Sequence, residues 1–260
     1  MTSTYLLYLD ILGFKKMVEQ NDPRIDDLFE RVDTLRVFMD EAFKTLIFSD
    51  TIICFLKHDP RSKEARETML MYACEASQSL FYHCVQLGIV FRGVLTFGEF
   101  KYTKHKHFDS YYGKALIDAY QKDNGHEITG TGLFVDKSIS SNLNIFRTIE
   151  YNDKFDFVYP NQSIGDFENW PKAAFPIDWI LLEGPSLLDL DAKYFKFLKN
   201  QIDTHQDEYI RSKYLTTYEL YKKRFSGLIE FLELNDFDHR KLSPEVDWEE
   251  KLDEFPRSIY

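Results

Sequence analysis

The sequence is poor in cysteine, and its cysteines do not fit a disulfide framework or a zinc site. Cys54, Cys74 and Cys84 are odd in number, include no C-x-x-C pair and lie within apolar stretches. We therefore predict reduced thiols buried in a core, in a reducing and cytoplasmic setting.

Long apolar runs are also missing. The longest are about half of the ~20 residues that span a bilayer, and no basic leader precedes the first apolar segment, which starts at Tyr5. We expect a soluble protein that does not contact a membrane.

Positive charge is in deficit. The chain has 43 acidic and 32 basic residues and a net charge of -11, so no positive field is available for a nucleic-acid backbone, and we expect no nucleic-acid partner. A protein of this kind that handles a polyphosphate needs cations held by carboxylates. The sequence contains neither a G-x-x-x-x-G-K-[ST] loop nor a G-x-S-x-G elbow. His105 and His107 lie in a Lys-rich stretch, 101–107, which we expect to be an exposed loop and which lacks further zinc ligands.

The first half of the sequence predicts an α+β fold. Residues 5–12 read as a buried strand, 14–19 and 22–42 as helices, 45–49 and 51–56 as strands around a turn at Ser49-Asp50, 64–87 as a helix ended by Gly88, and 89–99 as a strand. This β-α-β-β-α-β order matches the ferredoxin-like (split βαβ) palm, in which helices cover one face of an antiparallel sheet.

The second half predicts a mainly helical extension. A helix at 112–123, an extended segment at 130–135, a short helix at 136–142 and strand-like residues at 146–159 complete the palm. Helices are predicted near 189–204 and 206–233, followed by an irregular tail after Asn235. We place the domains at 1–175 and 176–260 and expect the second to pack on the first.

Two aspartates are the strongest candidates for chemistry. Asp10 lies inside an apolar strand, where a carboxylate needs a cation or hydrogen-bond donors, although it could simply cap a turn. Asp50 lies at a hairpin tip, where aspartates commonly just form turns. In a split βαβ sheet the first strand lies beside the following hairpin, so the two carboxylates would meet and could bind paired cations.

Arg92 lies midway along the next strand. Its guanidinium suits a phosphate through bidentate hydrogen bonds, and the alternative is an ion pair with one of the aspartates.

The segments Tyr-Leu-Asp10-Ile-Leu-Gly-Phe, Phe-Ser-Asp50-Thr-Ile and Phe-Arg92-Gly-Val-Leu-Thr-Phe-Gly-Glu together resemble the class III nucleotidyl cyclases, with separations of 40 and 42 residues. The resemblance covers roughly residues 5–160. It implies that Asp10, Asp50 and the backbone carbonyl of Ile11 bind two divalent cations, Mn²⁺ or Mg²⁺, and that Arg92 holds the triphosphate. It also places Gly13, Phe14 and Ser49 at the cofactor. The implied reaction is in-line attack of the ribose 3′-hydroxyl on the α-phosphorus, with pyrophosphate leaving.

The chain departs from the family further on. Ile117 and Gln121 stand where the family has its asparagine and arginine, and Lys122 or Lys114 could replace the lost charge. Leu46 and Ser110 fall where the family has its purine-reading lysine and aspartate. These differences disfavour ATP.

With the run at 111–120, these departures resemble the pyrimidine cyclases of bacterial Pycsar anti-phage systems. That resemblance implies a cytoplasmic homodimer with composite active sites that makes cyclic UMP, or less favourably cyclic CMP, for a separate effector. Ser110, Tyr111 and Tyr112 are candidates for reading the base by position alone. A purine cyclase and a catalytically inactive nucleotide-binding palm remain alternatives.

Overall fold

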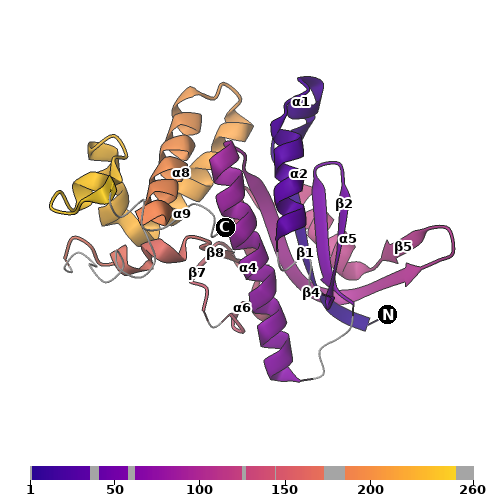
Figure 1. The fold of residues 1–260 in the computed structure, drawn as a ribbon. Helices are drawn as coiled ribbons and strands as arrows, with labels where there is room; N and C mark the ends of the chain where they lie inside the picture. Colours follow the sequence, from indigo (N-terminus) through magenta and orange to yellow (C-terminus); the bar gives the residue numbers. More distant parts are fainter. Residues whose placement is uncertain are drawn as a thin grey trace. The chain divides into compact units, whose positions relative to one another are not determined.

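The computed structural model describes residues 2–35, 41–57, 62–124, 127–143, 145–172 and 185–249 (Figure 1). The chain forms two compact units that divide between Pro160 and Asn161. The sequence analysis places this boundary at 175/176. The 3₁₀ helix η1 (Gln162–Phe167) packs against the helices of the second unit.

The first unit is built on one mixed sheet with the strand order β2-β3-β1-β4-β6-β8-β7. Its strands are β1 (Thr2–Ile11), β2 (Phe43–Phe48), β3 (Thr51–Leu56), β4 (Phe91–Lys104), β6 (Gly132–Asp136), β7 (Thr148–Glu150) and β8 (Phe155–Val158). The pairs β2–β3, β3–β1 and β1–β4 are antiparallel, and β4–β6 is parallel. The order 2-3-1-4 is that of a split βαβ sheet, which confirms the predicted fold class.

Both faces of this sheet are covered, since Leu6 and Tyr8 on one face of β1 and Leu7 and Leu9 on the other are all buried. Leu6 and Tyr8 of β1 belong to a buried cluster that includes Ala115 and Ala119 of α5 (Lys114–Asn124). The long helix α4 (Lys63–Leu87) contacts β1 and β4, and α2 (Arg24–Thr34) packs against α4. Helices therefore lie on more than the single face that the sequence pattern predicts.

Helix α4 has the termini that its sequence predicts. The Ser62 hydroxyl accepts a hydrogen bond of 3.1 Å from the amide of Ala65, and Gly88 ends the helix with φ +65°. Its buried positions include Cys74 and Cys84, which like Cys54 are free and buried. Burial raises the pKa of the Cys54 thiol to about 12. The predicted free thiols buried in a core are confirmed.

Two predicted boundaries are wrong. Helix α2 ends at Thr34 rather than near Ala42, because Leu35 is extended and residues 41–42 form a turn. Strand β4 runs to Lys104 and pairs with β5 (Asp109–Tyr112), so the stretch 101–107 is largely a hairpin rather than a loop. The shorter elements α1 (Phe14–Glu19) and α6 (Lys137–Ser140) agree with the sequence pattern.

The second unit contains the predicted pair of long helices, α8 (Pro185–Thr204) and α9 (Glu208–Leu234), which pack against each other. Asn161 donates to the buried carboxylate of Asp191 and accepts from the hydroxyl of Tyr221, which ties η1 to both helices. None of the helices in the described ranges is long and apolar enough to cross a membrane.

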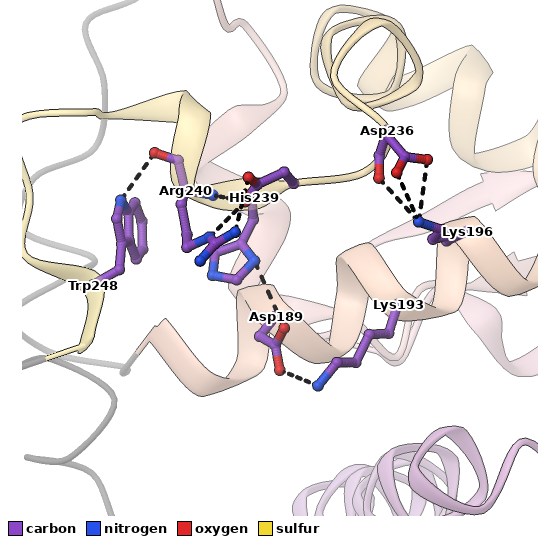
Figure 2. Close-up of polar contacts among 8 residues, drawn as sticks. Asp189, Lys193, Lys196, Asp236, His239, Arg240 and Trp248 are labelled. Atoms are coloured by element: carbon purple, nitrogen blue, oxygen red, sulfur yellow. Dashed lines mark hydrogen bonds and ion pairs between the residues drawn. The ribbon is translucent and has the colours of Figure 1, made fainter.

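The segment after α9 is more ordered than the irregular tail that the sequence predicts. It contains the 3₁₀ helix η2 (His239–Leu242) and the buried Trp248, whose indole N–H donates to the carbonyls of Arg240 and Ser243. Figure 2 shows how this segment meets α8: Lys196 binds Asp236, and His239 lies 3.7 Å from an Asp189 oxygen.

Candidate functional site

Asp10 and Asp50 lie close together where neighbouring strands of the sheet end, a part of the sheet that we call the Asp10 edge. Asp10 is the penultimate residue of β1, and Asp50 lies in the two-residue turn between β2 and β3. Asp10 pairs with Thr51 across the β1–β3 ladder, and the amide of Ile11 donates a hydrogen bond of 2.9 Å to the Asp50 carbonyl. Both aspartates are half-buried. The backbone therefore brings the two residues close together at the ends of their strands.

Arg92 is the partner of Asp10 on the other side of β1. The two residues are directly paired in the antiparallel β1–β4 ladder, so their side chains emerge on the same face of the sheet. Arg92 is only 4% exposed, and its Nη1 donates a hydrogen bond of 3.1 Å to the carbonyl of Ile128. The guanidinium is thus held by the loop before β6 and lies in the same cross-strand row as Asp10.

The row continues across β3 and β2. Thr51 pairs with both Asp10 and Phe48, and the Tyr8 hydroxyl lies 3.5 Å from the Thr51 hydroxyl. Phe48 is 75% exposed. Asp10, the buried Arg92 and the exposed Phe48 therefore share one cross-strand row, and Asp50 lies in the turn beside it.

The turn after β1 is fixed by its backbone conformation. Gly13 has φ +79°, a left-handed conformation that side chains disfavour, and it is the N-cap of the short helix α1. Phe14 is buried against Phe29 of α2, with ring centroids 6.1 Å apart. Ser49 also has positive φ, at +55°, and is exposed in the turn beside Asp50.

The donor atoms at this edge suit hard divalent cations. Two carboxylates and a main-chain carbonyl are oxygen ligands of the kind that Mg²⁺ and Mn²⁺ prefer. Across the described residues no group of three or more His, Cys, Asp or Glu side chains could hold a metal, so an ion here would need water or a phosphate to complete its shell.

Other predicted site residues lie elsewhere in the fold. Leu46 of β2 is half-buried against the cluster under α5. Ser110, Tyr111 and Tyr112 lie in β5 and pair with residues 101–103 of β4. From position 92 to position 101 the strand advances about 30 Å, at roughly 3.3 Å per residue. These three residues therefore cannot reach the Asp10 edge within one chain.

The helix that carries the family departures is α5. Ile117 is 56% exposed, and Gln121 is exposed as well. Lys114 pairs with Asp118 one turn further on, so its charge is partly used locally. The side chain of Lys122 lies outside the described part of the chain.

The sequence reasoning missed three residues that border the site. Tyr8 and Thr51 could have been found, because strand alternation places both on the face of Asp10. Ile128 gave no such signal, because its carbonyl meets Arg92 across 36 residues of sequence.

No protein-family model matches the sequence, and no curated protein matches it either. Among solved structures, the chain is similar to the adenylyl cyclase CyaB from P. aeruginosa, at 9% identity and a TM-score of 0.46, covering 60% of this chain and 93% of that one. It is also similar to the guanylyl cyclase Cya2, at 13% identity and a TM-score of 0.43, covering 60% and 91%. A bacterial light-regulated adenylyl cyclase gives 14% identity and a TM-score of 0.44, covering 61% and 90%.

Proposed function

We propose that this chain is a metal-dependent nucleotidyl cyclase that converts UTP, and less readily CTP, to the 3′,5′-cyclic monophosphate and pyrophosphate. The observation that carries the proposal is the juxtaposition of Asp10 and Asp50, closed by the bond from the Ile11 amide to the Asp50 carbonyl. Carboxylates at this edge offer oxygen ligands for divalent cations, and a nucleoside triphosphate is bound together with such ions.

The residues of this edge divide the work by their chemistry. Asp10, Asp50 and the Ile11 carbonyl would hold the divalent ions. Ions bound there would lower the pKa of the ribose 3′-hydroxyl and neutralise charge on the phosphates. Arg92, fixed by Ile128 and in the row of Asp10, is the cation that would bind the triphosphate through directed hydrogen bonds.

The preference for a pyrimidine rests on the two positions where the family reads a purine. Leu46 offers no hydrogen bond, and its half-buried side chain packs against the core cluster under α5. The Ser110 hydroxyl lies 2.9 Å from Nε2 of His105 within the hairpin. Neither residue provides the charge that reads a purine, which favours UTP or CTP.

The active unit in this proposal is a homodimer with composite sites. Six exposed apolar side chains on β2, β5 and α5 support a second copy as partner, namely Ile47, Phe48, Tyr111, Tyr112, Ile117 and Tyr120. A second chain would also allow Ser110, Tyr111 and Tyr112 to serve the metal edge of its partner. In the Pycsar-like role, the cyclic product would act on a separate effector in anti-phage defence.

The test is incubation of the purified protein with ATP, GTP, CTP and UTP separately, with Mn²⁺, and identification of products by mass spectrometry. We expect cyclic UMP or cyclic CMP, lost in Asp50→Ala. The matched control is Asp33→Asn, an exposed aspartate on α2. A purine product would redirect the assignment to an adenylyl or guanylyl cyclase. Binding of a triphosphate without turnover would support an inactive nucleotide-binding palm instead.

A further inference from the structure

The loop before β6 holds the side chain of Arg92 by a hydrogen bond. Ile128 is buried, and its carbonyl accepts the 3.1 Å hydrogen bond from Arg92 Nη1. The loop then leads through the fully buried Thr131 into Gly132, which is the direct neighbour of Arg92 in the parallel β4–β6 pair. Arg92 is therefore held by the loop from its guanidinium and by the sheet from its backbone.

Tyr151, at the turn between β7 and β8, binds the main chain of this loop. The Tyr151 hydroxyl accepts a hydrogen bond of 2.8 Å from the amide of Thr129, and it lies 3.4 Å from the carbonyl of the same residue, to which it can donate. One hydroxyl thus engages both main-chain groups of the residue that follows Ile128. A group in this position fixes the orientation of the adjoining peptide, to which the Ile128 carbonyl belongs.

The grip is reinforced on either side of the tyrosine. Asn152 donates from Nδ2 to the carbonyl of Glu127, at 3.4 Å, and Lys154 binds the Glu127 carboxylate at 2.8 Å. The Lys154 pair is exposed and contributes little. The tyrosine ring itself is set by Phe134, with centroids 5.0 Å apart in an edge-on arrangement. The Tyr151 hydroxyl is thus the half-buried, specific contact of the set.

We propose that Tyr151 is a positioning residue for the phosphate-binding Arg92, acting through Thr129 and the Ile128 carbonyl. This inference rests on the proposed function. Tyr151 acts on Arg92 through the main chain of Thr129 and Ile128. Its hydroxyl keeps the Ile128 carbonyl where it can hold one guanidinium nitrogen, and this sets the direction of the donors that meet the triphosphate. A bidentate contact is sensitive to such an orientation.

The experiment is a double-mutant cycle on nucleotide affinity. Wild type, Tyr151→Phe, Arg92→Ala and the double variant are titrated by calorimetry with 3′-deoxy-UTP and Mn²⁺, since this probe lacks the hydroxyl that attacks. We expect Tyr151→Phe to weaken binding about five-fold, the size of one hydrogen bond. In the Arg92→Ala background the same change should have no further effect. Arg92→Lys provides a second background, because its ammonium lacks the planar fork, and it serves if Arg92→Ala fails to fold.

The matched control is Tyr218→Phe, which removes a tyrosine hydroxyl bound to Glu233 in the second unit and should leave the affinity unchanged. If Tyr151→Phe weakens binding equally in the wild-type protein and in the Arg92→Ala variant, the positioning role is overturned and the cyclase proposal stays intact. No affinity of the wild type for any of the four triphosphates, with or without Mn²⁺, would overturn both proposals. Unchanged affinity in Tyr151→Phe would overturn the positioning role alone.

Discussion

The amide of Ile11 donates a 2.9 Å hydrogen bond to the carbonyl of Asp50, so the end of β1 and the tip of the β2–β3 turn are joined through their main chains. The two carboxylates are placed by this backbone bond and by the pairing of Asp10 with Thr51. Their side chains can consequently be changed without removing the contacts that bring them together.

Replacing either aspartate should therefore abolish activity while the fold persists. We expect Asp10→Asn and Asp50→Asn each to lower the turnover of UTP by about 100-fold or more, as found when one preorganised charged or polar group is removed from an active site. The midpoint of urea unfolding should change little. Turnover and unfolding are measured on the same preparations, and a variant that unfolds early would not count as support.

Removal of divalent ions should have the same consequence. We expect a chelator to abolish turnover, and excess Mn²⁺ to restore it. The oxygen ligands of Asp10, Ile11 and Asp50 carry no positive charge, so the charge on a triphosphate is neutralised only when they hold cations. Isothermal titration with Mn²⁺ provides a measurement that is independent of activity. Equal Mn²⁺ affinity in wild type and Asp10→Asn would argue against a metal site at this edge.

Substitution of Gly13 should destabilise the turn that follows Asp10. Its φ of +79° is left-handed, and an added Cβ would meet no atom within 4 Å, so the cost arises from backbone conformation rather than from a clash. We expect Gly13→Ala to lower the free energy of unfolding by about 1 kcal/mol. Gly13→Asn is the matched control and should cost less, since asparagine tolerates this region. Equal losses in the two variants would contradict this explanation.

The buried imidazole of His239, beside Asp189 of α8, predicts that the stability of the second unit depends on pH. His239 is only 6% exposed. Burial lowers the pKa of its imidazole; Asp189 and Asp238 oppose this shift, whereas Arg240 and Lys193 add to it. Because the folded-state pKa lies below the unfolded value of about 6.5, the unfolded chain takes up a proton first as pH falls. Stability should be full above pH ~6.5 and decline below it.

Unfolding of wild type and His239→Gln from pH 8 to pH 5 measures this dependence. The wild type should lose more stability than the variant between pH 7 and pH 5, because glutamine does not titrate. Other titrating groups, including His83, are present in both proteins, so the difference isolates His239. Parallel pH profiles would show that the imidazole does not change its protonation on unfolding.

The exposed apolar side chains on β2, β5 and α5 predict self-association. We expect Ile117→Asp to shift the protein from dimer to monomer in sedimentation experiments and to reduce turnover strongly, because a charge in the middle of a protein interface is costly. Leu234→Ser is the matched control: this residue is 87% exposed on α9, and its replacement should leave the mass unchanged. A wild-type protein that is active as a monomer would exclude the composite site.

Much of the fold could be predicted from local patterns, because strand and helix periodicities in the first 100 residues are strong and Gly88 marks a helix end. The two aspartates followed from the same strand order. The β4–β5 hairpin was missed because its polar, Lys-rich stretch has no apolar alternation, and its pairing is made by the backbone. The α2 end was misplaced because helical spacing continues beyond Thr34, whereas the backbone of Leu35 is extended.

The environment of Arg92 shows where sequence reasoning stops. Its position opposite Asp10 follows from strand counting. Ile128, which accepts its hydrogen bond, and Tyr151, which bonds to Thr129, lie in loops whose sequences carry no motif. Contacts across 22 and 36 residues depend on how the whole sheet assembles. Such contacts produce no recognisable pattern in the local sequence.

Strand β4 carries Arg92 near its start and pairs with β5 over its last four residues, 101–104. Since neighbouring residues of a strand point to opposite faces, a one-residue deletion between these parts would rotate one of them by half a turn relative to the other. A two-residue deletion would shorten the strand and preserve the facing. The interval between the guanidinium and the hairpin can therefore change length only by even steps, which makes it a parity constraint on how this chain can diverge.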